Sequence, residues 1–124
     1  MNRTVAIAVS ELIFQSRIRA AAEGLGLSIA IADTPARAEA AIAARPALVV
    51  VDLQERNVDP LGVIETAKRA GAAVLAFGRH TDAKSLRAAR AAGADAAVPR
   101  SQLKEELPEL LRALTEAPAD GAKP

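Results

Sequence analysis

Two carboxylates, two cations and a histidine stand directly at the ends of short apolar runs in this chain. Glu11 follows the first run, Asp52 ends the third, Arg79 and His80 follow the fourth, and Arg100 follows the fifth. In an open parallel sheet, ligands bind beyond the carboxyl ends of the strands, where the strand order reverses. If these runs are strands of one such sheet, the carboxylates can hold a metal ion and the arginines can pair with an anion.

Two hydroxyl residues lie beside these groups, but the chain shows no nucleophilic set. Ser10 and Ser101 follow the first and fifth runs, and both are predicted helix N-caps. Neither stands in a Ser–His–acid arrangement, and His80 alone does not indicate a general base. We therefore do not expect an enzyme with its own substrate.

Five short runs are predicted strands. Each is apolar on both faces, which is typical of a parallel sheet covered by helices on both sides. Turn or capping residues follow each run. The runs are Thr4–Val9, Leu27–Ala32, Ala47–Val51, Ala73–Phe77 and Ala96–Val98.

The segments between the runs have helical spacing. In the first, Leu12, Ile13, Phe14 and Ile18 fall on one broad face that we expect to be buried. Pro108 predicts a kink in the last helix or a separate first turn. The predicted helices are Glu11–Glu23, Pro35–Ala44 capped from Asp33-Thr34, Leu61–Ala70, Asp82–Ala92 capped by Thr81 or Asp82, and Ser101 to about Ala117.

This alternation predicts a three-layer α/β/α sandwich around a five-stranded parallel sheet. We assign residues 1–117 to one domain and expect residues 118–124 (PADGAKP) to form a disordered tail.

The composition excludes several classes of function. The 124 residues are 51% hydrophobic and 25% charged, with a net charge of +1, no Cys, one His and two Phe. Disulfides, thiolate metal sites and multi-histidine centres are excluded, and aromatic stacking on nucleic-acid bases is disfavoured. No run reaches the roughly 20 apolar residues that span a bilayer. We expect a cytoplasmic protein that binds neither membrane nor, through this domain alone, nucleic acid.

Three stretches carry a family likeness. The stretch Ala47–Leu53 (ALVVVDL) contains Asp52 after an apolar run, Ala91–Ser101 (AAGADAAVPRS) joins a glycine turn to Arg100, and Thr4–Leu12 contains an acidic residue after its apolar run. Together they resemble the receiver domains of two-component response regulators. The resemblance covers nearly the whole chain and implies a flavodoxin-like strand order of 2-1-3-4-5.

The resemblance also implies a site. Asp52 would be the phosphoacceptor in a phosphorelay, Glu11 and Asp52 would hold Mg²⁺, and Arg100 with Gly78 and Arg79 would contact the phosphoryl anion. Glu11 has an equally weighted alternative role as a first-turn helix residue stabilised by the helix dipole.

The chain departs from the family pattern at several of these positions. Ser10 stands where the family has the first residue of an acidic pair, Gly78 where it has a hydroxyl residue, and Arg100 where it has lysine. The loop Gln54–Pro60 is longer than usual. Two functions follow: a stand-alone, divergent receiver-like signalling domain with Asp52 as acceptor, or a phosphorylation-independent pseudo-receiver that serves as a scaffold or dimerisation module. The second predicts an Asp52–Arg100 contact without a metal.

A basic stripe marks a candidate interaction surface. Lys84, Arg87 and Arg90 recur every three residues on the fourth predicted helix, so they are neighbours on its surface. In receivers, the fourth helix, fifth strand and fifth helix form the usual signalling face. The resemblance implies a histidine kinase or another signalling protein as partner, or a second copy of the chain in a dimer. The alternative is a solvated helix face. A flavin or small-ligand domain is disfavoured, because no glycine-rich phosphate loop follows the first run.

Overall fold

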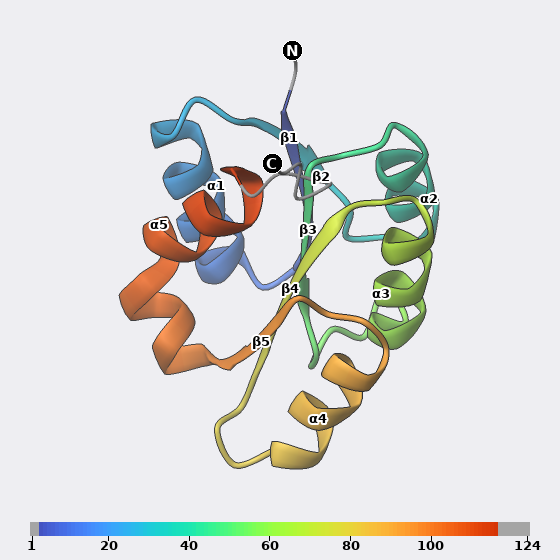
Figure 1. The fold of residues 1–124 in the computed structure, drawn as a ribbon, viewed down its shortest axis with the longest axis vertical. Coiled ribbons are helices and arrows are strands. Elements are labelled where there is room, and N and C mark those ends of the chain that lie inside the picture. Colours follow the sequence, from blue (N-terminus) through green and yellow to red (C-terminus); the bar gives the residue numbers. More distant parts are fainter. Residues whose placement is uncertain (1–2, 117–124) are drawn as a thin grey trace, which may run out of the picture.

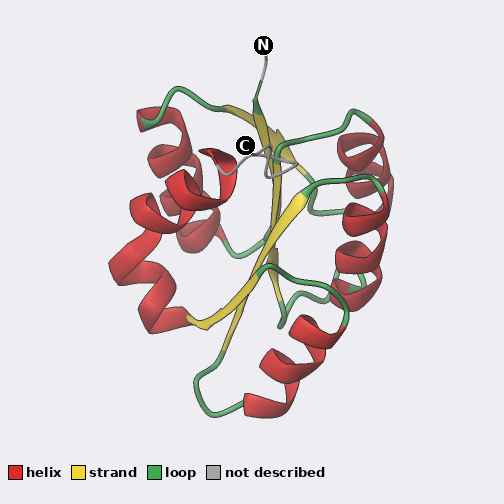
Figure 2. Cartoon of the chain, viewed as in Figure 1, coloured by secondary structure: helices red, strands yellow, loops and turns green. Residues whose placement is uncertain are grey.

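The computed structural model describes residues 3–116, in which five strands alternate with five helices (Figures 1 and 2). The predicted tail, 118–124, lies outside the described residues. The elements are β1 (Thr4–Ala8), α1 (Leu12–Gly24), β2 (Ser28–Ile31), α2 (Pro35–Ala43), β3 (Leu48–Asp52), α3 (Pro60–Arg69), β4 (Ala73–Gly78), α4 (Ala83–Ala91), β5 (Ala96–Pro99) and α5 (Arg100–Glu116).

The strands form one parallel sheet in the order β2-β1-β3-β4-β5, which confirms the predicted fold class. Val5 of β1 pairs with Ile29 of β2 on one side and with Leu48 of β3 on the other. Helices α1 and α5 cover one face of the sheet, and α2, α3 and α4 cover the other (Figure 1). Since β1 and β3 are neighbours whose following helices leave from opposite faces, the crevice predicted for ligands opens at their carboxyl ends.

The two faces of the sheet carry side chains of different size, because successive strand residues point to opposite faces. The face toward α1 and α5 is built from large side chains, whereas the face toward α2, α3 and α4 is rich in alanine. The large set includes Val5, Ile7, Val50, Leu75 and Phe77, and the alanine-rich set includes Ala6, Ala8, Val49, Val51 and Ala76.

Two helices have the side-chain N-caps that the sequence predicted. The hydroxyl of Thr34 accepts a hydrogen bond from the backbone N–H of Arg37 at 3.1 Å, with Pro35 in the first turn. Asp82 accepts from the backbone N–H of Ser85 at 3.1 Å. Both caps satisfy a donor that the helix itself leaves unpaired.

The two serines predicted as caps do not have that role. Glu11, one residue after Ser10, is the N-cap of α1, and the Ser10 hydroxyl donates to Glu55 instead. Ser101 lies inside α5, which begins at Arg100. Helix α1 starts one residue later, and α5 two residues earlier, than a cap at each serine requires.

Helix α5 is kinked, which is one of the two outcomes predicted from Pro108. Glu106 has φ −116° and ψ 20°, outside the helical region. Proline has no N–H to donate and its ring crowds the preceding turn, so the break falls just before it. Leu103 and Leu111 are nevertheless both buried, because the kink keeps the two halves of the helix on the sheet.

The predicted inward face of α1 is wrong at its first turn. Leu12 is 72% exposed and Ile13 is 64% exposed, whereas Ile18 and Ala22 further along are buried. Phe14, in the same turn, does pack against the buried cluster on this face of the sheet, with its ring centroid 5.3 Å from that of Phe77. None of the helices within residues 3–116 is long and apolar enough to cross a membrane.

Candidate functional site

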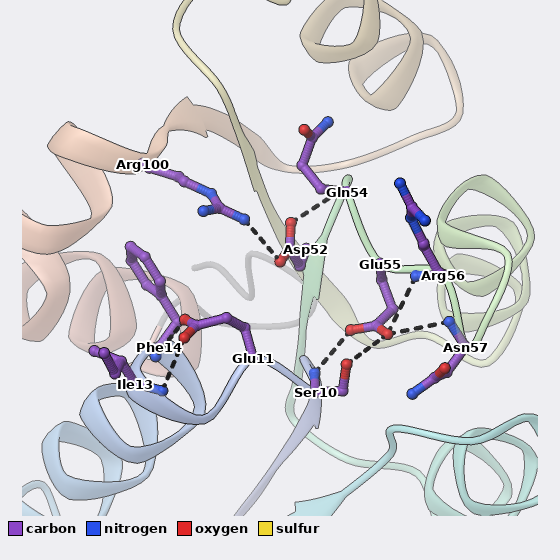
Figure 3. A network of polar contacts seen from close by, with 10 residues as sticks. All are labelled: Ser10, Glu11, Ile13, Phe14, Asp52, Gln54, Glu55, Arg56, Asn57 and Arg100. Atoms are coloured by element: carbon purple, nitrogen blue, oxygen red, sulfur yellow. Dashed lines mark hydrogen bonds and ion pairs between the residues drawn. The ribbon is translucent and has the colours of Figure 1, made fainter.

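Asp52, the last residue of β3, is 3% exposed and forms an ion pair with Arg100, the first residue of α5. Its Oδ2 accepts from Nη2 of Arg100 at 3.1 Å, and its Oδ1 accepts from the backbone N–H of Gln54 at 2.8 Å (Figure 3). Each carboxylate oxygen of Asp52 therefore already has a donor from the protein.

Two aromatic rings hold the guanidinium of Arg100 in place. The rings of Phe14 and Phe77 are stacked, with centroids 5.3 Å apart, and the guanidinium carbon lies 5.2 Å from the first centroid and 5.9 Å from the second. Cations over aromatic faces at such distances are attracted by the ring quadrupole. Nε of Arg100 is buried and has no hydrogen-bond partner among the described residues, so the Nη2 bond to Asp52 and the two rings hold the guanidinium.

Burial raises the pKa of the Asp52 carboxyl above its ordinary value. The N–H of Gln54 and the charge of Arg100 oppose this rise, while the nearby negative charge of Glu55 adds to it. The net pKa shift is upward, so the loss of water around Asp52 outweighs its ion pair.

Glu55 is a second buried carboxylate, and its oxygens accept from four donors. Ser10 donates through its backbone N–H at 2.7 Å and its hydroxyl at 2.8 Å. The backbone N–H groups of Arg56 and Asn57 donate at 3.2 and 3.1 Å. These hydrogen bonds tie the β1–α1 turn to the β3–α3 loop (Figure 3). Glu55 is not among the site residues predicted from the sequence, where its only signal is a carboxylate in the long loop after Asp52.

Glu11 lies at the N-terminus of α1. This position agrees with its alternative role as a residue stabilised by the helix dipole. Its two carboxylate oxygens accept from the backbone N–H groups of Phe14, at 3.0 Å, and Ile13, at 3.2 Å (Figure 3). A carboxylate in this position satisfies two unpaired donors and is stabilised by the positive end of the helix dipole.

The turns after β1, β3 and β5 do converge, as the sequence predicted. Ser10, Glu11, Asp52 and Arg100 line one cavity of about 410 Å³ together with the loop that contains Glu55. The convergence unites the carboxylates and the guanidinium that the sequence analysis singled out.

The carboxylates of this cavity do not fit Mg²⁺ as they are arranged. Mg²⁺ requires near-octahedral oxygen ligands. Here the oxygens of Glu11 and Glu55 point at N–H and O–H donors, and those of Asp52 at an N–H and a guanidinium. In residues 3–116, no group of three or more His, Asp or Glu side chains could hold a metal ion.

The residues after β4 lie apart from this cavity. Gly78 is buried, and a Cβ at this position would stand 3.5 Å from the side chain of Leu53, an ordinary contact. Arg79 and His80 are exposed. None of these three β4-end residues lines the cavity around Asp52, so anion binding by Gly78 and Arg79 remains a prediction.

The strand order and the place of the site define a class of fold. An aspartate ends the third strand of a 2-1-3-4-5 parallel sheet and faces a basic residue after the fifth strand. This is the flavodoxin-like α/β fold that receiver domains have.

Solved structures of receiver domains share this fold. The signal receiver domain of the DNA-binding response regulator protein merR from Colwellia psychrerythraea 34H matches 93% of this chain and 99% of its own, with TM-score 0.80 and 20% identity. A response regulator from Thermotoga maritima matches 94% of this chain and 99% of its own, with TM-score 0.78 and 18% identity.

A longer response regulator matches over only part of its length. NtrX from Brucella abortus has TM-score 0.78 and 21% identity over 94% of this chain, which spans 27% of the NtrX chain. No family model matches the sequence, and no curated protein matches it.

Proposed function

We propose that the chain is a receiver-like signalling domain that works as a pseudo-receiver: Arg100 closes the Asp52 pocket, and the domain acts through protein contacts without phosphoryl transfer. The observation that carries the proposal is the ion pair between Arg100 and Asp52, with the guanidinium held over Phe14 and Phe77. The fold shared with receiver domains supports the signalling class.

Phosphoryl transfer to Asp52 would meet three obstacles in this geometry. The carboxylate would have to leave Arg100 before an oxygen could attack phosphorus, and the half-buried guanidinium would then lose its ion-pair partner. Glu11 and Glu55, the carboxylates that would hold a Mg²⁺ ion to offset the charge on the transferring oxygens, are engaged with other donors. Gly78 offers no hydroxyl to a phosphoryl oxygen.

Beryllofluoride, which mimics a phosphoryl group on aspartate, tests the proposal. We expect no movement of the amide NMR resonances of Asp52, Gln54 and Arg100 when beryllofluoride and Mg²⁺ are added to the full chain. Saturable shifts at these residues would show that Asp52 is a competent acceptor and would overturn the pseudo-receiver.

A gain-of-function variant is the matched control for a negative result. Ser10→Asp combined with Arg100→Lys restores the residue types that the receiver family has at these positions. We expect this variant to respond to beryllofluoride in the same titration. A response in the variant alone assigns the loss of acceptor chemistry to Ser10 and Arg100.

We propose the α4–β5–α5 face as the contact surface for an acidic protein partner, such as a histidine kinase or another signalling protein, or for a second copy of the chain. Lys84, Arg87 and Arg90 are all exposed on α4. Nη2 of Arg90 donates to the backbone carbonyl of Ala97 in β5 at 2.7 Å, which holds that guanidinium beside the strand.

Sedimentation of the full chain tests the self-association arm of this proposal. We expect a concentration-dependent dimer that Lys84→Glu with Arg87→Glu dissociates, since the variant reverses charge on the proposed face. Arg17→Glu, at an exposed arginine of α1, is the control and should leave the dimer intact. A monomer at every concentration would remove the second copy as partner.

A further inference from the structure

A second cavity, with no residue in common with the Asp52 pocket, lies between α2 and α3. Its volume is about 620 Å³. Its apolar surface comes from buried side chains. These are Ala38 and Ile42 of α2, Val58 of the loop before α3, and Val63 of α3. We call this cavity the α2–α3 groove.

A hydrogen bond joins the chain after α2 to the chain after α3. Nη1 of Arg45, just after α2, donates to the backbone carbonyl of Ala70, just after α3, at 3.0 Å. This hydrogen bond bridges the carboxyl ends of the two helices. The groove itself is lined by residues of α2, of α3 and of the loop before α3. Its volume is within the range of small-molecule sites, roughly 300–1,000 Å³.

Two carboxylates without partners lie on the walls of the α2–α3 groove. Asp59 occupies the N-cap position of α3 but makes no capping hydrogen bond. Glu39 of α2 also lines the groove, and no hydrogen bond or ion pair to it occurs within residues 3–116. No Lys, Arg or His lines this cavity.

Gly62 makes room for one of these carboxylates. A Cβ at Gly62 would lie 2.8 Å from Oδ2 of Asp59, closer than real Cβ atoms come to other atoms. The Asp59 carboxylate therefore lies over the first turn of α3, beside the groove. A larger residue at position 62 would collide with it.

We infer that the α2–α3 groove binds a small organic ammonium ion with an apolar body. The apolar body would cover Ile42, Val58 and Val63, and the ammonium group would donate hydrogen bonds to Glu39 and Asp59. An unpaired carboxylate on an apolar wall favours a cation over a neutral or anionic ligand of the same shape. The inference does not depend on the state of Asp52, so it can fail or hold independently of the pseudo-receiver proposal.

Phenylbutylamine is a suitable probe, and phenylbutanoate is its anionic control. In an amide NMR titration of the full chain at pH 7, we expect phenylbutylamine to give saturable shifts in residues 35–43 and 58–69. Phenylbutanoate should give none there. The resonances of Asp52 and Arg100 should stay in place with both compounds.

Removing the two charges tests the role assigned to the carboxylates. We expect Glu39→Gln with Asp59→Asn to weaken phenylbutylamine binding about fivefold, since partly solvated charge pairs each contribute a modest amount. Glu65→Gln, at an exposed α3 residue outside the groove, is the matched control and should bind as the unaltered chain does. All three positions are exposed, so each variant should keep the amide spectrum of a folded chain.

Three results would overturn the inference. These are an absence of saturable shifts at α2 and α3 with millimolar phenylbutylamine, equal binding of phenylbutanoate, and unchanged affinity in the Glu39→Gln, Asp59→Asn variant.

Discussion

Asp52 is at the carboxyl end of β3, and Asp95 directly precedes the amino end of β5. The two aspartates have the same kinds of partner. Asp52 accepts from the backbone N–H of Gln54 at 2.8 Å and pairs with Arg100 at 3.1 Å. Asp95 accepts from the backbone N–H of Val74 at 2.8 Å and pairs with Lys68 at 2.8 Å. Each aspartate has one peptide donor and one cation from a helix.

The two ion pairs differ in how much water reaches the carboxylate. The side chain of Asp52 is 4% exposed and that of Asp95 is 38% exposed, while both cations are 34% exposed. Water can replace a lost partner of Asp95, but it cannot readily replace one of Asp52. We therefore expect the same two contacts to stabilise the fold more at Asp52 than at Asp95.

Arg100→Ala should have the largest effect of the changes considered. It leaves Asp52 buried beside Glu55 without a cation, and it removes the guanidinium from the rings of Phe14 and Phe77. We expect the free energy of unfolding to fall by about 3 kcal/mol at neutral pH, in the range for breaking one side of a buried pair. Urea unfolding measures it.

The double variant Arg100→Ala, Asp52→Asn provides the control for this loss. Because it removes the buried charge together with its partner, it should recover part of the lost stability. A double variant that is as unstable as the sum of the two single variants would show that Arg100 stabilises the fold only through the aromatic rings.

Glu55→Ala should have the next largest effect. It tests whether hydrogen bonds from N–H and O–H groups stabilise the buried Glu55 carboxylate as much as the Arg100 cation stabilises Asp52. The change leaves the peptide N–H groups of Ser10, Arg56 and Asn57 without their acceptor. We expect a loss of about 2 kcal/mol, the cost of leaving partly buried donors unpaired. Glu55→Gln keeps one acceptor oxygen and should cost less in the same urea measurement. Equal losses would mean that the donors find water.

The pH dependence of stability tests the upward pKa shift of Asp52. The pKa of Asp52 is raised in the folded chain, so the folded state binds its proton more readily than the unfolded state does. Stability from this group is therefore greatest below its unfolded pKa, and it falls as pH rises through the folded pKa. We expect Asp52→Asn to remove this fall, so that the variant gains stability relative to the unaltered chain as pH rises from 3 to 7. The reverse trend in thermal unfolding would contradict the upward pKa shift.

The sequence predicted which residues lie at the carboxyl ends of the strands better than it predicted the hydrogen-bond partners of those residues. Alternating apolar runs and helical segments fix the strand order once the fold resembles a known one, and Asp52 and Arg100 fall at strand ends. The predicted scaffold alternative included their contact, and the structure contains it. Such contacts follow from topology, because parallel strands bring their carboxyl ends to one edge.

Glu55 and the first turn of α1 could not be predicted in the same way. Glu55 contacts Ser10 from 45 residues away, through a loop whose path no periodicity encodes. Leu12 and Ile13 have helical spacing, but spacing does not say which residues of a helix's first turn are covered. The choice of cap between Ser10 and Glu11 rested on a single residue, which is within the uncertainty of any helix boundary.

Lys68→Ala should have the smallest effect and completes the comparison. Asp95 keeps its hydrogen bond from Val74 and gains water in place of the ammonium group, so we expect a loss of about 0.5 kcal/mol. The loss should shrink in high salt, which screens exposed pairs far more than buried ones. The corresponding loss in Arg100→Ala should persist in the same salt series, measured by urea unfolding in KCl. If both losses shrink alike, water reaches Asp52 as readily as Asp95, and Arg100 does not seal the pocket.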